Sequence, residues 1–363
     1  MKTIISLVGA RPQFVKEAGI GNSFRNRKDL SYLLVHSGQH YDFNMSDIFF
    51  QELGIHQPEY NLGVGSSSHG KQTAEVLSSL EELLLREEPD LLLVYGDTNT
   101  TLAGALAASK LKIPVAHVEA GIRQEPRNMP EEINRVLTDH VSSLLCCCSD
   151  LSRENLEKEG IYRGVHVVGD IMLDVYRKME KGFDREKGVQ NMGLSEGKYM
   201  VMTLHRDFNV DDPASLKAIL EGISRLSQET RLEVLFPIHP RTKKRVSEFG
   251  LEDKLKGLRV VEPMGYLELM SLVQGCRYVI TDSGGLQKEA YFAGKRALVI
   301  MPDTGWRELT NYGWNILAAP DPESIVQSGL SLMDPLPYPD TVYGSGNTSD
   351  QIVEILEGYL EGR

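Results

Sequence analysis

The chain has 363 residues, of which 41% are hydrophobic, and its formal net charge is -12 at pH 7. This length is sufficient for two domains, each with its own core. The acidic balance argues against a nucleic-acid partner, and the absence of any apolar run of membrane-spanning length argues against a membrane protein.

Short apolar stretches alternate with amphipathic stretches in the first half of the chain. Strands are predicted at 4–8, 33–36, 91–94, 115–118, 144–148 and 166–168, and the helices between them include 72–88 and 100–110. The first strand leads directly into a glycine turn, so we do not interpret the N-terminus as a signal peptide. This alternation predicts a parallel sheet with helices on both faces.

Three of the four cysteines are adjacent, at 146–148, within one predicted strand. Neighbouring side chains of a strand point to opposite faces, so these thiols cannot converge on one metal ion. Buried, reduced thiols are typical of a cytoplasmic protein, and we expect a cytoplasmic location.

The alternation pauses at a charged stretch, 174–196, and then resumes. Further strands are predicted at 199–203, 233–237, 259–261, 278–281 and 296–300, and the Pro-rich stretch 334–340 ends this series. A last helix is predicted at 349–360, capped by Thr348 or Ser349 and packed back onto the first domain. The chain is therefore α/β, with two doubly wound Rossmann-like domains, 1–170 joined by 347–363, and 171–345.

The segment Ser283-Gly284-Gly285 lies at a predicted turn from a strand to a helix. Glycines permit close approach of a ligand, and the free N–H groups of a first helical turn favour an anion. Glu289 follows within two turns and is suited to accept hydrogen bonds from ribose hydroxyls. The segment is interpreted either as a nucleotide site or as a tight turn followed by a surface glutamate.

Charged side chains and imidazoles follow most of the other strands. Asp97, Glu119 and Glu131 do so in the first half, and His205 and His239 in the second. Each has a simpler interpretation, since Asp97 is a plausible helix cap and Glu131 a first-turn carboxylate. Their repetition after successive strands instead indicates a ligand cleft between the domains.

Several common sites are missing from the sequence. No G-x-G-x-x-G follows a strand, and there is no Walker A sequence, nucleophile elbow or H-E-x-x-H pattern. We therefore expect neither a nicotinamide cofactor nor a metal.

Taken together, the motifs resemble the non-hydrolysing UDP-N-acetylglucosamine 2-epimerase family. The resemblance covers nearly the whole chain and rests on segments 9–12, 37–40, 96–98, 117–121, 130–135, 204–206 and 281–285. It implies a glycosyltransferase-B fold with the active site in the interdomain cleft. It also implies inversion at C2 of a UDP-2-acetamido sugar without cofactor or metal, and a homodimer as the assembly.

The resemblance also implies the roles of individual residues. Asp97, Glu119, Glu131 and His205 match the catalytic residues. The UDP or substrate ligands are expected to be Arg11, Lys16, Arg135, Arg206, Ser283, Gly284, Gly285 and Glu289. The sequence leaves open which carboxylate is the acid and which the base.

Four positions depart from the best-known bacterial members. Gln13 and Phe208 each stand where those members have a glutamate, and Tyr41 stands where they have an arginine. Near Trp306 those members carry Thr-Glu-Arg-Pro-Glu, where this chain reads Thr-Gly-Trp-Arg-Glu at 304–308. The segments 11–13, 39–42 and 313–315 are more similar to the archaeal branch and to the branch acting on UDP-2,3-diacetamido-2,3-dideoxyglucuronate. A hydrolysing 2-epimerase, a glycosyltransferase of the same fold and a non-catalytic nucleotide-sugar-binding protein remain alternatives.

Overall fold

The computed structural model describes residues 1–24, 27, 30–38 and 57–362. The chain divides into two compact units. Unit 1 comprises Met1–Arg177 and Thr341–Arg363, and unit 2 comprises Lys178–Asp340. The helix α7 (Ile171–Glu180) contains the change from one unit to the other, whereas the sequence analysis placed the boundary just before it, at 170.

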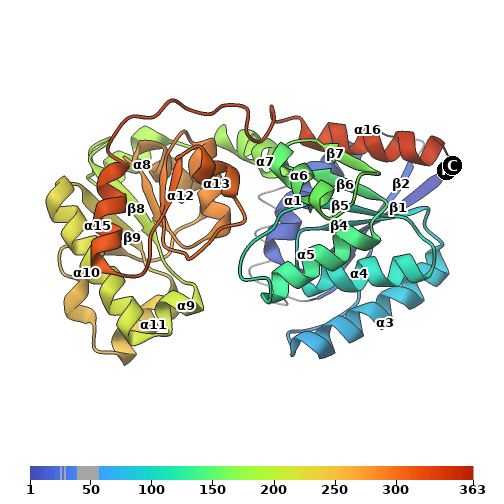
Figure 1. The fold of residues 1–363 in the computed structure, drawn as a ribbon, viewed down its shortest axis with the longest axis horizontal. Coiled ribbons are helices and arrows are strands. Elements are labelled where there is room, and N and C mark those ends of the chain that lie inside the picture. Colours follow the sequence, from blue (N-terminus) through green and yellow to red (C-terminus); the bar gives the residue numbers. More distant parts are fainter. Residues whose placement is uncertain (25–26, 28–29, 39–56, 363) are drawn as a thin grey trace. The chain divides into compact units, whose positions relative to one another are not determined.

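Unit 1 is built on a parallel sheet, in which seven strands are described, in the order β3-β2-β1-β4-β5-β6-β7 (Figure 1). The strands are β1 (Lys2–Val8), β2 (Leu30–His36), β3 (Tyr60–Asn61), β4 (Leu91–Tyr95), β5 (Val115–Ala120), β6 (Leu144–Cys147) and β7 (Val165–Val167). The chain proceeds outward from β1 in one direction and then from β4 in the other. The topological switch point, where doubly wound folds bind ligands, thus lies between β1 and β4.

Side chains that alternate along these strands pack into two different cores, one on each face of the sheet. Ile4, Leu91 and Leu93 pack with α1 (Arg11–Phe24) and α16 (Thr348–Glu361). Ile5 and Leu92 pack on the other face, against α3 (His69–Glu87) and α4 (Asn99–Lys110). Unit 1 also contains α5 (Pro130–Val141) and α6 (Asp150–Lys158).

Unit 2 repeats this plan with the order β10-β9-β8-β11-β12-β13. Its strands are β8 (Tyr199–Thr203), β9 (Glu233–Pro237), β10 (Arg259–Val261), β11 (Val279–Thr281), β12 (Ala297–Val299) and β13 (Asn315–Leu317). Its helices are α8 (Arg185–Asn191), α9 (Asp207–Val210), α10 (Pro213–Thr230), α11 (Pro240–Glu248), η1 (Glu252–Leu255), α12 (Tyr266–Gly275), α13 (Gly284–Phe292), α14 (Arg307–Asn311) and α15 (Pro322–Ser331).

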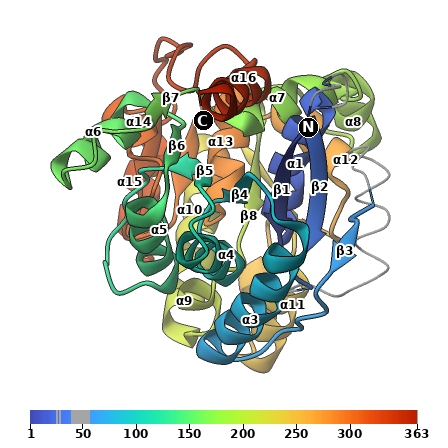
Figure 2. The same ribbon diagram turned by 90° about the vertical axis from the view of Figure 1, so that its right-hand side faces the viewer.

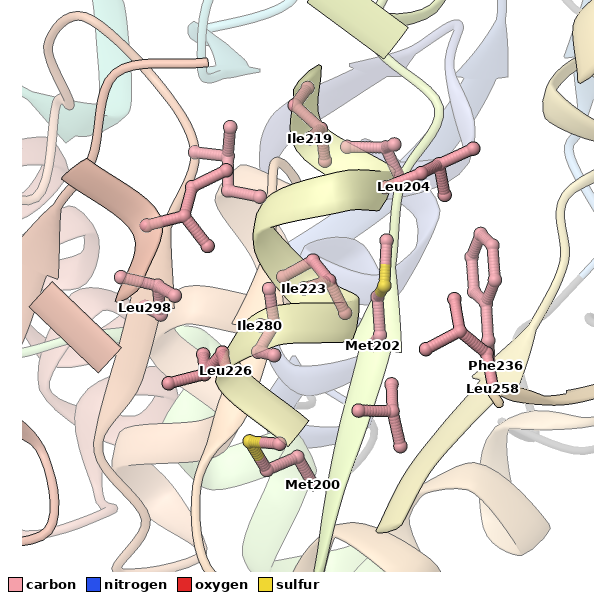
Figure 3. Close-up of a cluster of buried hydrophobic side chains, with 14 of the residues drawn as sticks. Met200, Met202, Leu204, Ile219, Ile223, Leu226, Phe236, Leu258, Ile280 and Leu298 are labelled. Carbon is pink, nitrogen blue, oxygen red and sulfur yellow. The ribbon is translucent and has the colours of Figure 1, made fainter. Parts of the chain in front are cut away.

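The core of unit 2 forms where α10 lies across the sheet. Ile219, Ile223 and Leu226 recur at helical spacing along α10 and pack against Met202 of β8 and Ile280 of β11 (Figure 3). Both strands belong to the centre of the sheet. The doubly wound α/β class predicted from the sequence is confirmed for both units.

The C-terminal helix α16 packs against α1 of unit 1, as predicted (Figures 1 and 2). Its predicted cap is wrong. Neither Thr348 nor Ser349 caps the helix with its side chain, because the N-cap position is Asn347. Instead the carboxylate of Asp174, on α7, accepts hydrogen bonds from the backbone N–H groups of Thr348 and Ser349, at 3.1 and 2.7 Å. The cap comes from a residue far away in the sequence.

The cysteines of β6 and the segment that follows it are buried and reduced. Cys146, Cys147 and Cys148 are free thiols, and burial raises the pKa of Cys146 to about 12. Across the part of the chain that the structure describes, no helix is long and apolar enough to cross a membrane.

Candidate active site

The carboxyl ends of β1, β4 and β5 bring polar segments together at one edge of the sheet in unit 1. The turn after β1 passes very close to its neighbours. A Cβ atom added at Gly9 would lie 2.3 Å from Thr100 Oγ1 and 2.4 Å from Ser37 Oγ. Only glycine permits this approach, which holds the start of α1 against the start of α4.

Gln13 connects the same two turns with its buried side-chain amide. The oxygen accepts hydrogen bonds from the backbone N–H groups of Gly9 and Ala10, at 2.8 and 3.0 Å. The nitrogen donates to the carbonyl of Tyr95 and lies within 3.0 Å of the hydroxyls of Thr98 and Thr101. An amide is required for this arrangement, because the group both accepts and donates.

Asp97 follows β4 and is paired with Arg135 of α5. It is not the cap of α4, since Thr98 occupies that position and accepts a hydrogen bond from the N–H of Thr101. Burial raises the pKa of Asp97, but the positive charges of Arg135 and Lys16 outweigh this effect and leave the pKa below its ordinary value. Asp97 is therefore a carboxylate at neutral pH.

Glu119 forms an ion pair with Lys16 of α1, and both side chains are largely buried, at 8% and 10% exposure. Glu119 has a φ of +71°, and the pairing of β5 with β6 shifts between Val118 and Ala120. This bulge changes the direction of the Glu119 side chain relative to regular alternation. Gly96 lies directly beside the pair, since a Cβ there would be 3.1 Å from Lys16 Nζ and 3.7 Å from Glu119 Oε2.

Two adjacent glutamates begin α5, and they have different surroundings. Glu132 is 3% exposed, accepts a hydrogen bond from the N–H of Gln124 at 3.0 Å and pairs with Arg135 at 3.1 Å. Glu131 is half-buried and makes no hydrogen bond or ion pair with any residue that the structure describes. Glu132 thus positions Arg135, whereas Glu131 takes no part in this pairing. No local pattern in the sequence distinguishes the two glutamates.

In unit 2, a buried aspartate organises the segment that follows β8. The carboxylate of Asp282 is fully buried and accepts hydrogen bonds from the N–H groups of His205 and Arg206, at 3.0 and 2.8 Å. It also lies 3.2 Å from His205 Nδ1. Nδ1 donates to this carboxylate, which directs Nε2 of His205 away from Asp282.

His239 follows β9, and its ring centroid lies 5.4 Å from that of His205. Partial burial and the neighbouring charge of His205 lower the pKa of His239. Its Nδ1 accepts a hydrogen bond from the N–H of Arg241 at 3.2 Å. The two imidazoles therefore lie together at the carboxyl ends of adjacent strands.

The turn between β11 and α13 has the predicted form. Ser283 is the N-cap and accepts a hydrogen bond from the N–H of Leu286. Gly284 and Gly285 form the first turn of α13 and are not buried, so their N–H groups can meet an anion. Glu289 lies further along the same helix and is half-buried.

The comparisons with known proteins agree with one another over nearly the whole chain. The family model described as "UDP-N-acetylglucosamine 2-epimerase" matches residues 22–357. A "UDP-N-acetylglucosamine 2-epimerase homolog" of Methanococcus maripaludis is 44% identical, with 97% of this chain and 99% of the relative covered. The "UDP-2,3-diacetamido-2,3-dideoxy-D-glucuronate 2-epimerase" of Pseudomonas aeruginosa is 42% identical, again with 97% and 99% covered.

Among solved structures, the UDP-GlcNAc 2-epimerase of Methanocaldococcus jannaschii, in complex with UDP-GlcNAc and UDP, superposes with a TM-score of 0.86 at 40% identity. The match covers 99% of this chain and 100% of that one. This chain belongs to the UDP-N-acetylglucosamine 2-epimerase family. The predicted family, its archaeal-like and diacetamidoglucuronate-like branch and the glycosyltransferase-B fold are confirmed.

Two of this 2-epimerase's departures from the bacterial pattern have a structural counterpart. Gln13 ties two turns together, as described above. Trp306 donates a hydrogen bond from its indole nitrogen to the carbonyl of Gly284 at 2.8 Å, and the ammonium of Lys288 lies 3.7 Å from the indole centroid. Trp306 thus braces the first turn of α13 from the side. Nothing in the local spacing of the sequence indicated this contact.

For some of the predicted residues, the structure does not describe the side chain or does not describe the residue. Arg11 begins α1, but its side chain is not described, and the segment with Gln39, His40 and Tyr41 lies outside the described residues. Phe208 is described and is 45% exposed on α9. Within the described residues, no three His, Cys, Asp or Glu side chains are grouped to hold a metal ion.

Proposed function

We propose that this 2-epimerase inverts C2 of a UDP-2-acetamido sugar by eliminating UDP and adding it back. The observation that carries the proposal is the cluster at the carboxyl ends of β4 and β5, where Asp97 and Glu119 are paired with Arg135 and Lys16. Carboxylates that are paired with cations in a fixed geometry are suited to proton transfer.

The chemistry explains why UDP must leave. The C2 proton is not adjacent to a carbonyl group, so a carboxylate cannot remove it directly. When the C1–O bond breaks, the electron pair departs with UDP, C2 loses its proton to a base, and a C1=C2 double bond forms. Addition of UDP to C1 and of a proton to the other face of C2 completes the inversion.

Each step has candidate residues. We assign Asp97, Glu119, Glu131 and His205 to the proton transfers. The N–H groups of the first turn of α13, from Ser283 to Gly285, together with Arg206 and Arg11, would stabilise the departing diphosphate. Glu289 would accept hydrogen bonds from the ribose. Arg135 and Lys16 keep Asp97 ionised, and Lys16 also pairs with Glu119.

Two substrates fit the relatives, UDP-N-acetylglucosamine and UDP-2,3-diacetamido-2,3-dideoxyglucuronate, because proteins named for each are similar over the whole chain. Proton NMR with each sugar in deuterated water tests the proposal. Deuterium at C2, with UDP retained on the sugar, is expected for one of them. Release of free UDP would show a hydrolysing enzyme, and no change without an acceptor would favour a transferase or a binding protein.

A homodimer and a cytoplasmic location stay predictions of the sequence analysis. Light scattering after size-exclusion chromatography measures the first directly. A monomer with full epimerase activity would contradict it.

A further inference from the structure

A buried imidazole lies directly beneath the carboxylates of unit 1. His117 is on β5 and is 0% exposed. Its Nε2 lies 2.7 Å from the carbonyl oxygen of Gly96, and its Nδ1 lies 2.7 Å from Asp139 Oδ1, on α5. A carbonyl oxygen has no proton to give, so Nε2 must donate.

Asp139 also behaves as an acceptor only. Its Oδ2 accepts hydrogen bonds from the N–H of Gly121 at 3.1 Å and from Arg123 Nη1 at 2.8 Å. Burial raises the pKa of Asp139, but His117 and Arg123 outweigh burial and leave the pKa below its ordinary value. Nδ1 of His117 therefore donates to an ionised carboxylate. With both nitrogens donating, the ring of His117 carries a positive charge.

This pair fixes the backbone on both sides of the catalytic carboxylates. Gly96, the residue before Asp97, donates its N–H to the carbonyl of Val118 at 3.0 Å and accepts from His117 through its own carbonyl. Gly121, two residues after Glu119, is held by Asp139. The bulged Glu119 therefore lies between two anchored residues of the same segment, His117 and Gly121.

We propose that His117 is a positioning residue, a buried imidazolium that with Asp139 fixes the backbone under Asp97 and Glu119 and stabilises the carboxylate of Asp97. The proposal rests on the proposed function for its catalytic consequence. Burial raises the pKa of Asp97, Arg135 and Lys16 lower it, and the charge of His117 adds a smaller lowering.

Other charged or titratable groups surround the pair. Arg123 is itself paired with Glu159 at 2.7 Å, and Cys147 of β6 interacts with Asp139. Around Asp97 lie Lys16 and Arg135. Burial raises the pKa of Cys147, so this thiol remains neutral at ordinary pH. Among the hydrogen bonds of the described residues, the acceptors for the His117 ring are Asp139 and the carbonyl of Gly96.

The charge is tested in the intact protein by nitrogen-15 NMR of histidine-labelled material. The sequence has nine histidines, and comparison with His117→Gln assigns the signal. We expect both ring nitrogens of His117 to carry a proton, because Asp139 and the carbonyl of Gly96 both accept from the ring. A signal from a neutral tautomer would overturn the proposal. This measurement does not depend on any enzymatic activity, so it separates this proposal from the proposed function.

The positioning role is tested by kinetics with UDP-N-acetylglucosamine or the diacetamido substrate, whichever is turned over. In His117→Gln and in Asp139→Asn, kcat should fall by roughly tenfold to a hundredfold. KM should stay within about twofold. The acidic limb of the kcat–pH profile should move to higher pH, because the pKa of the Asp97 carboxyl group rises when a nearby positive charge is lost. His140→Gln, on the exposed side of α5, is the matched control and should match wild type.

An unchanged acidic limb in both variants would overturn the electrostatic part of the proposal, and an unchanged kcat would overturn the positioning part. If His117→Gln does not fold, the His117 signal is assigned by its change in Asp139→Asn, and the wild-type signal and the kinetics of Asp139→Asn decide the outcome.

Discussion

The side-chain amide of Gln13 donates a hydrogen bond to the backbone carbonyl of Tyr95, with the two atoms 2.8 Å apart. This bond joins the turn after β1 to the end of β4, the strand that leads to Asp97. Because those strands flank the topological switch point, the bond stabilises the base of the candidate site.

We therefore predict that Gln13→Leu destabilises the protein by about 1–3 kcal/mol, since it leaves the N–H groups of Gly9 and Ala10 buried without their acceptor. Gln13→Glu should cost less, because a carboxylate still accepts from both. Urea unfolding measures the difference, and Gln190→Leu, at an exposed position of α8, is the control. Equal stability of Gln13→Leu and wild type would contradict the bridging role.

A second prediction concerns Asp97. Asp97→Asn keeps the size of the side chain and removes the charge that pairs with Arg135. If Asp97 transfers a proton, turnover should fall by roughly a hundredfold or more, while the fold and most of the UDP affinity persist. Turnover and UDP affinity should be measured together, with Asp350→Asn on the exposed start of α16 as the control. Near wild-type turnover would remove Asp97 from the mechanism.

The sequence was sufficient to predict both sheets because hydrophobic periodicity is a local property. The long strands of each sheet were expected at or within a few residues of their observed positions. The strands β3, with 2 residues, and β13, with 3 residues, were not predicted, although the equally short β10 was.

Contacts between distant residues could not be predicted in this way. The cap of α16 comes from Asp174, and local propensity instead favoured Thr348 or Ser349. The same limit applies to Asp282, which organises His205 and Arg206 across 77 and 76 positions of the sequence. The place of a polar residue directly after a strand predicts the edge of the sheet at which it lies. Its hydrogen-bond partner depends on the packing of the whole unit.

A third prediction follows from Asp282. Burial raises its pKa, but the hydrogen bonds and charge of His205 and the N–H of Arg206 outweigh burial and place the pKa below the ordinary value. A depressed pKa in the folded state means that the carboxylate stabilises the fold above its unfolded pKa, roughly 3.9, and that this contribution is lost as pH falls through the folded pKa.

Asp282→Asn should therefore be less stable than wild type at pH 7 by about 1–3 kcal/mol, and the difference should shrink as pH falls below roughly 4. Both tryptophans, Trp306 and Trp314, lie in unit 2, so their fluorescence during urea unfolding reports on this unit. Asp253→Asn, at an exposed position of η1, should show no such pH dependence. A difference that grows toward low pH would have the wrong sign for this account.

The last prediction concerns Glu289 and the nucleotide. Glu289 lies on α13 beyond the first turn, where a carboxylate is unsuited to a phosphate but suited to the hydroxyls of a ribose. If it accepts hydrogen bonds from them, Glu289→Ala should weaken UDP binding by roughly 1.5–3 kcal/mol, the range for hydrogen bonds to a charged group. Calorimetric titration should then show a much smaller loss for 2′,3′-dideoxyuridine diphosphate, which lacks both hydroxyls. Glu268→Ala, on the exposed face of α12, controls for the loss of a negative charge in unit 2. Equal losses for the two nucleotides would exclude the ribose contact and leave Glu289 with a role in the structure of α13.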